Sequence, residues 1–397
     1  MSSFQTFQLR ASSHRALAEM NIETPTAIQA SSIPFLLERK DVIAQAQTGS
    51  GKTLAFGLPM IEHVDPQRRH VQALVLTPTR ELARQVGDVL SQLGKPAGIR
   101  VTLVYGGVGY GNQEQQLANG AHIVVGTPGR VLDHLKRRTL KLQDVHFLVL
   151  DEADEMLDRG FAPDVERIIA MTPRSRQTAL FSATTPSWVD QIAAKHLVDP
   201  EIIKSDEGDG SEPDIEHLVM EVFREDKFQA LVRLLREPVE GATLVFGRTK
   251  RGVTNLGRRL NAAGFRVAVL EGNLNQAQRD RALDSFRSGK VPILVATNVA
   301  ARGLDILHIG QVINFELPET HELFTHRVGR TARMGRAGRA ITLISAVDLP
   351  KWQAIERGLG VKLPRLDADG KAVKAPPPVS RSRGWSRRRW SRGRAVA

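Results

Sequence analysis

The sequence contains no cysteine, which excludes disulfide bonds and thiolate metal sites. It also lacks any stretch approaching the roughly 20 consecutive apolar residues that a membrane-spanning helix needs. Its first residues lack the charged and apolar pattern of a signal peptide. Hydrophobic residues make up 41% of the 397, enough to bury the cores of about two to three ordinary domains. We therefore expect a soluble, cytoplasmic protein.

Positive charge is concentrated near the end of the chain. The net charge is +12, but nine Lys and Arg residues and no Asp or Glu lie from Lys371 onward, and removing them lowers the net charge to +3. This stretch has too little apolar surface to fold by itself. We expect residues 365–397 to form a disordered basic tail that binds a polyanion, either a nucleic acid or an acidic membrane surface.

Short β-branched runs alternate with helix-length segments in the rest of the chain. Such runs predict two α/β domains, each with a parallel sheet covered on both faces. The acidic segment 206–214 has no apolar residue and is therefore expected to be a solvated linker. The predicted units are residues 1–205, the linker 206–214, residues 215–364 and the tail. The predicted strands are residues 41–45, 72–76, 100–104, 122–125, 146–150, 177–181, 243–246, 266–270, 293–296, 311–314 and 340–344.

A glycine-containing loop follows the first predicted strand and precedes an apolar helical segment. Gly49 and Gly51 allow backbone N–H groups to surround phosphate oxygens, and the helix N-terminus adds positive potential. Lys52 can neutralise phosphate charge, and the Thr53 hydroxyl can bind Mg²⁺. The usual pattern begins with Gly, where this chain has Ala46. A chance Gly-rich turn is the alternative. The candidate nucleotide contacts are Thr48, Gly49, Ser50, Gly51, Lys52 and Thr53.

Three carboxylates follow the predicted strand 146–150, in the sequence Asp151-Glu152-Ala153-Asp154. Ligands bind at the carboxyl ends of strands in open α/β sheets. Asp151 is placed to hold Mg²⁺, largely through water, and Glu152 to orient and deprotonate an attacking water molecule. An acidic first helical turn is the alternative, because helix dipoles favour acids there. The upstream phosphate loop favours the catalytic interpretation.

The chain resembles the DEAD-box RNA helicases, which take their name from the sequence at 151–154. Other motifs of that family occur in the same order from Phe4 to Ile344. The resemblance implies two RecA-like domains in tandem, with ATP and Mg²⁺ as cofactors and RNA as partner. It also implies that Gln29 hydrogen-bonds adenine and that Phe4 packs on the base. Asn21-Ile22 stands where the family usually has Gly and an aromatic residue.

The second half has no phosphate loop, so any nucleotide site there must be completed by the first half. The resemblance implies that Gly303 and Asp305 approach the nucleotide, with Asp305 at a ribose hydroxyl. Arg330 and Arg333 lie about one helical turn apart. They are implied to reach the γ-phosphate as arginine fingers. A basic nucleic-acid patch is the alternative. The family commonly has Asp where this chain has Asn298.

The resemblance also implies contacts to the RNA backbone and residues that couple the two domains. Hydroxyls, loop N–H groups and Arg side chains at strand ends suit phosphate contacts that carry no sequence information. The candidates for the RNA backbone are Arg80, Gly107, Thr127, Arg130, Thr249, Arg281 and Thr297. The candidates for coupling the nucleotide state to domain closure are Asp154, Ser182, Thr184 and His326. In the tail, Trp385, Arg387 and Trp390 are candidates for stacking and charge contacts with RNA.

Together these patterns predict an RNA-stimulated ATPase that closes two domains on one RNA strand and locally separates short duplexes. An ATP-dependent RNA clamp or annealing factor with little net unwinding is the alternative. A DNA-directed translocase and a non-enzymatic RNA-binding protein are further rivals. We expect a monomer that binds single-stranded RNA and short duplexes, with ribonucleoprotein assemblies as possible partners and no membrane partner.

Overall fold

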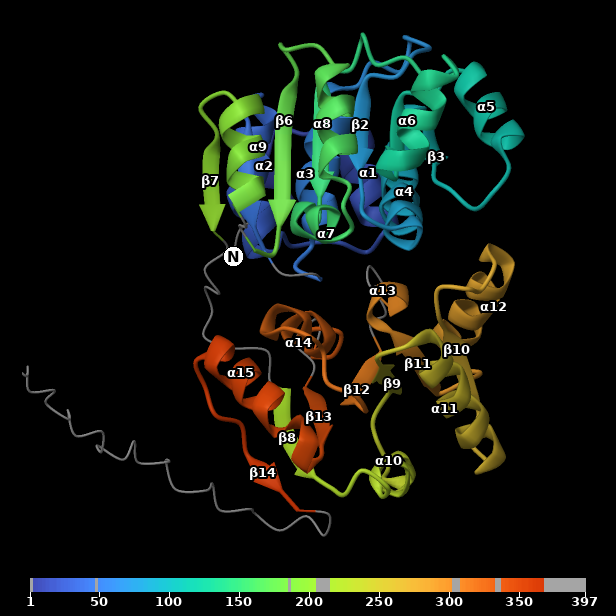
Figure 1. The fold of residues 1–397 in the computed structure, drawn as a ribbon. Coiled ribbons are helices and arrows are strands. Elements are labelled where there is room, and N and C mark those ends of the chain that lie inside the picture. The colour runs from blue at the N-terminus through green and yellow to red at the C-terminus, as the bar shows by residue number, and fades with distance from the viewer. Residues whose placement is uncertain are drawn as a thin grey trace, which may run out of the picture.

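The computed structural model describes residues 3–46, 49–184, 187–204, 215–301, 308–332 and 337–367. Within these ranges the strands form two seven-stranded sheets, and every paired strand runs parallel to its neighbour (Figure 1). The expected fold class, two RecA-like parallel-sheet domains in tandem, is confirmed. The expected linker and nearly all of the expected tail lie outside the described residues.

The first sheet has the strand order β3-β4-β2-β5-β6-β1-β7. Helices α1 to α4 pack together on one face, and α6, α8 and α9 pack on the other. The strands are β1 (Val42–Gln45), β2 (Ala73–Leu76), β3 (Val101–Val104), β4 (Ile123–Gly126), β5 (Phe147–Asp151), β6 (Gln177–Ser182) and β7 (Glu201–Lys204). The helices are η1 (Phe4–Thr6), α1 (Ala11–Glu19), α2 (Ala27–Leu37), α3 (Lys52–His63), α4 (Arg80–Gly94), η2 (Lys95–Ala97), α5 (Tyr110–Ala118), α6 (Pro128–Lys136), α7 (Ala153–Asp158), α8 (Ala162–Ala170) and α9 (Ser187–His196).

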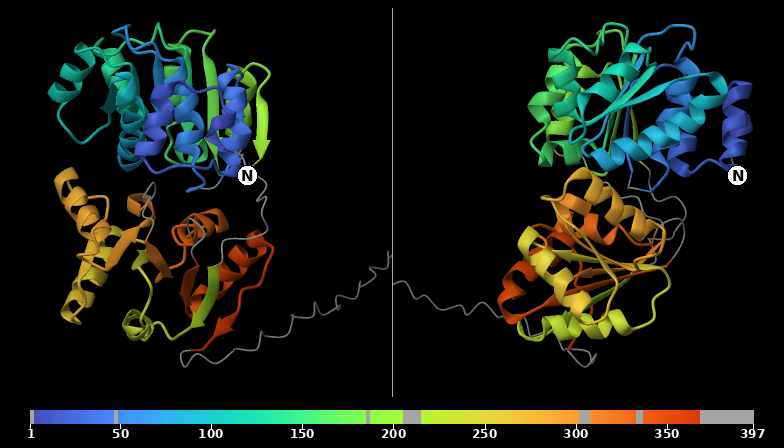
Figure 2. Two further views of the ribbon diagram at one scale, coloured as in Figure 1. Left: turned by 180° about the vertical axis from the view of Figure 1, so that it is seen from behind. Right: turned by 90° about the vertical axis from the view of Figure 1, so that its right-hand side faces the viewer.

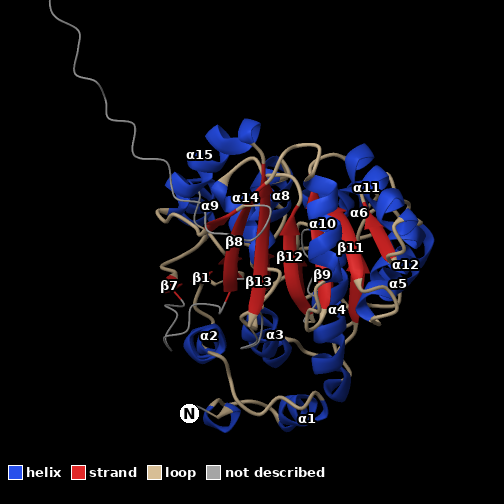
Figure 3. Ribbon diagram, turned by 90° about the horizontal axis from the view of Figure 1, so that it is seen from below, coloured by secondary structure: helices blue, strands red, loops and turns tan. Residues whose placement is uncertain are grey.

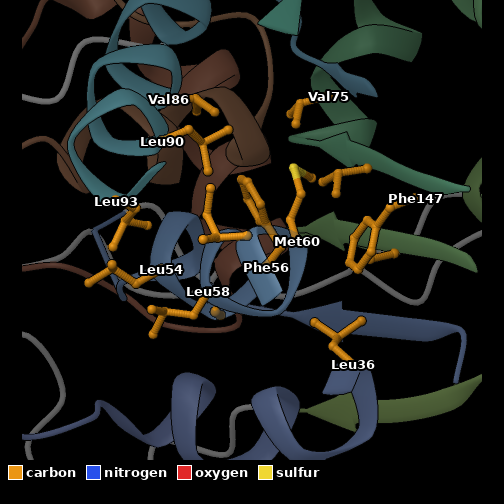
Figure 4. Close-up of a cluster of buried hydrophobic side chains, with 14 of the residues drawn as sticks. Leu36, Leu54, Phe56, Leu58, Met60, Val75, Val86, Leu90, Leu93 and Phe147 are labelled. Atoms are coloured by element: carbon orange, nitrogen blue, oxygen red, sulfur yellow. The ribbon is translucent and has the colours of Figure 1, made fainter. Parts of the chain in front are cut away.

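Successive side chains of the central strands point into two separate cores. In β2, Ala73 and Val75 join the core under α2, α3 and α4, whereas Leu74 and Leu76 join the core on the opposite face. This alternation has a period of two, as a strand requires. Figure 4 shows the first core, where apolar side chains of α3 and α4 meet those of the sheet. Because both faces are covered, these strands read as continuous apolar runs in the sequence.

The second sheet has the strand order β10-β11-β9-β12-β13-β8-β14. Figure 3 shows β8, β13, β12, β9 and β11 side by side. The strands are β8 (Ile215–Glu221), β9 (Ala242–Gly247), β10 (Val267–Leu270), β11 (Ile293–Thr297), β12 (Ile309–Asn314), β13 (Gly338–Ile344) and β14 (Arg365–Leu366). The helices are α10 (Lys227–Arg236), α11 (Lys250–Ala262), α12 (Gln276–Arg287), α13 (Asn298–Ala301), α14 (His321–Val328), η3 (Ala346–Asp348) and α15 (Leu349–Leu359).

The two sheets with their helices form separate layers, one above the other, in Figures 1 and 2. The carboxyl ends of β6 and β7 face the second unit, and α13 and α14 lie on the side of that unit nearest the first (Figure 1). Residues that follow strand ends in one unit therefore come close to helices of the other. No helix in the described ranges is both long and apolar enough to cross a lipid bilayer.

All eleven predicted strands are confirmed, but β7, β8 and β14 were not predicted. The reason is clearest for β8, where Glu216, His217 and Glu221 interrupt the apolar residues and most side chains are only partly buried. A strand of this kind lacks the apolar run of a central parallel strand. The short strand β14 lies just beyond Pro364, where the second domain was predicted to end, and pairs with β8.

Candidate functional site

The predicted phosphate loop connects β1 to α3, and two of its glycines adopt left-handed backbone conformations. Gly49 has φ 90°, and Gly51, the N-cap of α3, has φ 93°. A Cβ atom on Gly51 would collide with the side-chain nitrogen of Gln29. Glycine is therefore required at this position for both backbone conformation and space. Thr48 lies outside the described residues.

Lys52 is buried and its ammonium group donates to the carbonyl of Ala46, across the loop, at 3.1 Å. This hydrogen bond closes the loop on itself and gives the cation a neutral partner. A phosphate group has a full negative charge and would be a stronger acceptor. Thr53 follows in the first turn of α3 and is half-buried. The loop, the lysine and the hydroxyl group therefore lie together at the N-terminus of α3, where anions are favoured.

Gln29 braces the phosphate loop from α2. Its amide oxygen accepts the backbone N–H of Thr26 at 2.9 Å, and its amide nitrogen donates to the carbonyl of Gly51 at 3.0 Å. The Thr26 hydroxyl donates to the carbonyl of Ser50 at 2.8 Å. An amide group has two hydrogens and two lone pairs, so one of each remains for a ligand. Gln29 thus holds the loop in addition to its predicted role as an adenine contact.

Phe4 lies in η1 and is only 3% exposed. Its ring packs edge-on against Phe7, with the ring centroids 6.0 Å apart. Phe4 belongs to the same apolar core as the residues of α3. The ring is therefore covered in this structure, and stacking on an adenine requires its neighbours to move.

Asp151 ends β5 and is 2% exposed. Burial raises its pKa to about 7; the Lys52 ammonium lowers this pKa and the Glu152 carboxylate raises it further. Its Oδ1 atom is buried and has no hydrogen-bond partner among the described residues. A buried carboxylate oxygen without a donor is costly unless a cation or proton approaches it. This oxygen therefore fits the role of a cation ligand.

Mg²⁺ binds oxygen ligands and usually keeps several waters when one or two protein groups hold it beside phosphates. Asp151 and the Thr53 hydroxyl supply such oxygens at the ends of β5 and the phosphate loop. No cluster of three His, Asp or Glu ligands occurs in the described part of the chain. The donor set therefore fits a metal bound jointly with a nucleotide rather than a metal caged by protein alone.

Glu152 has an uncommon backbone conformation. It is the N-cap of α7 with φ 52° and ψ 54°, in the left-handed region, and its side chain is 5% exposed. Left-handed backbone at a residue other than glycine costs free energy and often occurs at functional sites. The turn directs the chain sharply from β5 into α7, immediately after Asp151. Glu152 therefore lies in the buried turn between β5 and α7, directly beside the metal candidate Asp151.

Asp154, Ser182 and Thr184 form one hydrogen-bonded network. One Asp154 oxygen accepts the Thr184 N–H at 2.9 Å and the Thr184 hydroxyl at 2.8 Å. The Ser182 hydroxyl donates to the Thr184 carbonyl at 2.5 Å and accepts the Asp154 N–H at 3.3 Å. The network ties α7, which follows the acidic motif, to the end of β6. Three of the four predicted coupling residues are thus in direct contact.

The fourth predicted coupling residue, His326, reaches this region from the other domain. Its Nδ1 atom lies 3.0 Å from Oε1 of Glu155, the residue after Asp154. His326 belongs to α14, and Glu155 is buried in α7. Glu155 was not predicted as a site residue, because an acid in a helical turn carries no signal of a partner in another domain. The pair joins the candidate catalytic motif to α14.

Arg330 follows α14 closely and is 6% exposed. Its Nε atom donates to the carbonyl of His326 at 3.2 Å, so the side chain lies along its own helix. Because His326 touches Glu155, the helix that leads to Arg330 lies against the first domain. Arg333, Gly303 and Asp305 lie outside the described residues.

Arg80 begins α4 and lies over the loop at Gly106 and Gly107. Gly107 has φ 83°, and a Cβ atom there would collide with the Arg80 guanidinium. Both terminal nitrogens of Arg130 donate hydrogen bonds to the carbonyl of Val108, at 3.1 and 3.0 Å, and so hold the same loop. The structure therefore brings three of the RNA candidates of the first half to one loop. The fourth, Thr127, is the N-cap of α6, directly before the helix that carries Arg130.

The RNA candidates of the second half lie on three separate elements. Thr249 is exposed and caps α11 by accepting the Gly252 N–H at 3.0 Å. Thr297 ends β11 and is buried, whereas Arg281 is exposed on α12 and donates to the carbonyl of Ala277 within its own helix at 3.2 Å. The tail candidates Trp385, Arg387 and Trp390 lie outside the described residues.

A second contact between the domains joins the N-terminal halves of α4 and α12, and it was not predicted from the sequence. Arg279 donates from Nε and Nη2 to Oε1 of Glu81, at 2.9 and 2.6 Å. Arg84 donates to Asp280 at 2.7 Å. Arg80 donates to Gln276 at 3.1 Å, so an RNA candidate also takes part in this contact.

Comparison with known proteins agrees with this geometry. The family model described as DEAD/DEAH box helicase matches residues 26–192, and the model described as helicase conserved C-terminal domain matches residues 226–335. The DEAD-box ATP-dependent RNA helicase CshA of Bacillus licheniformis is 45% identical over 365 residues, covering 92% of this chain and 75% of the relative. CshA of Geobacillus kaustophilus is 44% identical over 366 residues, covering 92% and 78%.

Solved structures extend the similarity to the three-dimensional fold. S. cerevisiae Dbp5 bound to RNA and ADP BeF3 matches with a TM-score of 0.85 and 34% identity, covering 93% of this chain and 96% of that chain. Mss116p bound to single-stranded RNA and AMP-PNP matches with a TM-score of 0.82 and 26% identity, covering 92% and 79%. On the sequence matches and the fold together, the chain belongs to the DEAD-box ATP-dependent RNA helicases.

Proposed function

We propose that this helicase hydrolyses ATP when RNA is bound and separates short duplexes locally, by closing its two domains on one strand. The observation that carries the proposal is the contact of His326 with Glu155, next to the acidic motif. It brings the helix that leads to Arg330 against the domain that holds Lys52 and Asp151. Neither half alone contains both sets of charges, so hydrolysis requires the two halves to meet.

The roles of the nucleotide site follow from its chemistry. Lys52 exchanges the carbonyl of Ala46 for the phosphates of ATP, and Glu152 orients and deprotonates the attacking water. Thr53 and Asp151 would hold Mg²⁺, largely through water, and the ion would supply positive charge at the phosphates. Arg330 and Arg333 stabilise the charge of the transferring phosphoryl group. Gln29, with Gly303 and Asp305 from the second half, positions the base and the ribose.

RNA binding is proposed along the loop at Gly107 and the strand ends near Thr249 and Thr297, through the sugar–phosphate backbone. Arg80 contacts this loop and also Gln276 of the other domain. RNA bound at the loop therefore favours closure, and closure favours ATP binding, because the coupling of two ligands is reciprocal. The units taking part are the predicted residues 1–205 and 215–364, connected by the linker 206–214, with the second unit extended to include β14.

The test follows closure and strand separation in the same protein. The chain has no cysteine, so Asp144→Cys and Arg258→Cys introduce two unique labelling positions, one on each domain. Both residues are exposed. We expect energy transfer between the labels to change only when ATP and single-stranded RNA are both present, and a short duplex to separate under the same conditions.

The controls in this assay distinguish the alternatives. Closure and ATP turnover without net strand separation would instead identify an RNA clamp or annealing factor. Equal stimulation by 2′-deoxy and RNA strands would identify a DNA-directed translocase. RNA binding without ATP turnover would contradict an enzymatic function.

A further inference from the structure

Arg327 is a buried cation that contacts no carboxylate among the described residues. It belongs to α14 and is 2% exposed. Its Nε atom donates to Oδ1 of Asn298 at 2.5 Å, and its Nη1 atom donates to Oδ1 of Asn314 at 3.0 Å and to the carbonyl of Glu316 at 2.6 Å. All three acceptors are neutral. Its Nη2 atom is buried without a hydrogen-bond partner in the described ranges.

Hydrogen bonds and a cation–π contact tie α14 to the carboxyl ends of three strands. Asn298 directly follows β11, Asn314 ends β12, and the guanidinium lies 4.9 Å from the ring centroid of Phe246 in β9. The same helix carries His326, which contacts the first domain, and continues to Arg330. A displacement of the Arg327 side chain would therefore move both of these residues relative to the sheet.

In the described part of the chain, the two carboxylates that act on this guanidinium form no ion pair with it. Burial lowers the pKa of Arg327, and Glu316 and Glu319 raise it only from a distance. The Glu316 carboxylate accepts the backbone N–H of Arg248 at 2.7 Å, and Glu319 pairs with Lys351 at 2.7 Å. An uncompensated charge in a low-dielectric site is costly and acts over a longer range than a charge in water.

The side chain at position 298 determines whether the charge of Arg327 is neutralised. It accepts from the guanidinium through a neutral oxygen, and it is only half-buried, so a carboxylate could replace its amide at small desolvation cost. Such a carboxylate would form an ion pair with Arg327 and cancel its charge. The amide orients the guanidinium and leaves its charge in place, one helical turn before Arg330.

We propose that Asn298 is a positioning residue for ATP turnover. Its amide oxygen fixes the Arg327 guanidinium, and with it the helix that leads to Arg330, while the positive charge stays available to attract the nucleotide phosphates. This inference rests on the proposed contact of Arg330 with the γ-phosphate. In this arrangement the phosphates of ATP supply negative charge to a guanidinium whose hydrogen-bond acceptors in the described residues are all neutral, so nucleotide binding and domain closure reinforce each other.

The test compares Asn298→Asp and Asn298→Ala in RNA-stimulated ATP turnover and thermal unfolding. Asn298→Asp keeps the acceptor but cancels the charge. We expect a KM for ATP at least about fivefold higher with kcat retained, and a Tm higher by about 2–4 °C for each kcal/mol that the new ion pair contributes. Asn298→Ala removes the acceptor, and we expect a lower kcat and a lower Tm because a buried N–H loses its partner.

Asn314→Asp is the matched control, because it places the same negative charge on the same guanidinium from β12. It should raise KM as Asn298→Asp does. A wild-type KM in both Asp variants overturns the charge argument. Wild-type kcat and KM in Asn298→Ala overturn the positioning argument. If Asn298→Ala does not fold, Asn298→Ser takes its place, because the serine hydroxyl is too short to reach the guanidinium in the same way. A lower kcat then supports the positioning argument, and wild-type kcat and KM overturn it.

Arg330→Ala, measured beside these variants, separates a failure of this inference from a failure of the proposed function. Wild-type turnover in Arg330→Ala would refute the γ-phosphate contact itself. In that case the kcat of Asn298→Ala still reports whether Asn298 positions α14, since His326 belongs to the same helix.

Discussion

The Arg279 guanidinium and the Glu81 carboxylate form an ion pair at 2.6 Å between the two domains, with side chains only 13% and 7% exposed. They join the first turns of α12 and α4. Arg84 and Asp280 form a neighbouring pair at 2.7 Å, with side chains 38% and 32% exposed. The two pairs connect the same helices but differ in their exposure to water, so they provide a matched comparison.

Glu81→Gln should weaken domain closure much more than Asp280→Asn. Removing one partner of a buried ion pair costs about 3–5 kcal/mol, because the other charge stays buried and unpaired. An exposed pair contributes only about 0.2–1 kcal/mol. The measurement is the concentration of RNA that half-maximally stimulates ATP turnover, which should rise strongly in Glu81→Gln. Similar values for the two variants would show that closure does not depend on the buried pair.

Glu152→Gln should retain ATP and RNA binding but lower hydrolysis by about 10²–10⁴-fold, because an amide cannot accept the proton of the attacking water. The closed complex with ATP and RNA should then persist, which slow RNA release would reveal. Near-normal turnover would assign the base to another residue. Glu155→Gln is a useful control, since Glu155 contacts His326 and should affect closure instead.

Arg330→Ala and Arg333→Ala should each lower RNA-stimulated turnover by about 10³-fold or more. The affinity of the full-length protein for ATP in the absence of RNA should change little, because these residues act only after closure. Single-turnover hydrolysis and nucleotide titration measure the two quantities separately. If either variant turns over ATP at the wild-type rate, the arginine that it replaces is not an arginine finger.

Truncation after Asp367 should leave a folded, RNA-stimulated ATPase that binds RNA more weakly. The cut must spare Arg365, which pairs with Glu221 at 3.1 Å and Glu356 at 2.9 Å beside β8. The nine cations beyond this point release counterions when they bind phosphates, so their removal should flatten the dependence of RNA affinity on salt. Equal salt slopes and affinities for the full-length and truncated proteins would exclude the tail as an RNA tether. Equal Tm values verify that the cut leaves the fold intact.

The sequence by itself determined the local chemistry of this protein. The glycines of the phosphate loop, Lys52, and the acids that follow β5 are adjacent in the chain, and their meaning depends only on the strand and helix beside them. The same holds for the central strands, because a strand that is buried on both faces has a continuous apolar run in its sequence. These features could be predicted because each depends on a few consecutive residues.

Only the tertiary structure decided which distant residues meet. The pairs Arg279–Glu81 and His326–Glu155 depend on how two sheets face each other, and no pattern within either segment encodes that relation. The strand β8 escaped prediction because its charged residues are tolerated where the sheet is only partly covered. Asn298 stood out in the sequence only as a departure from its relatives. Its contact with the buried charge of Arg327 became visible because folding brings β11 and α14 together, 29 residues apart in the chain.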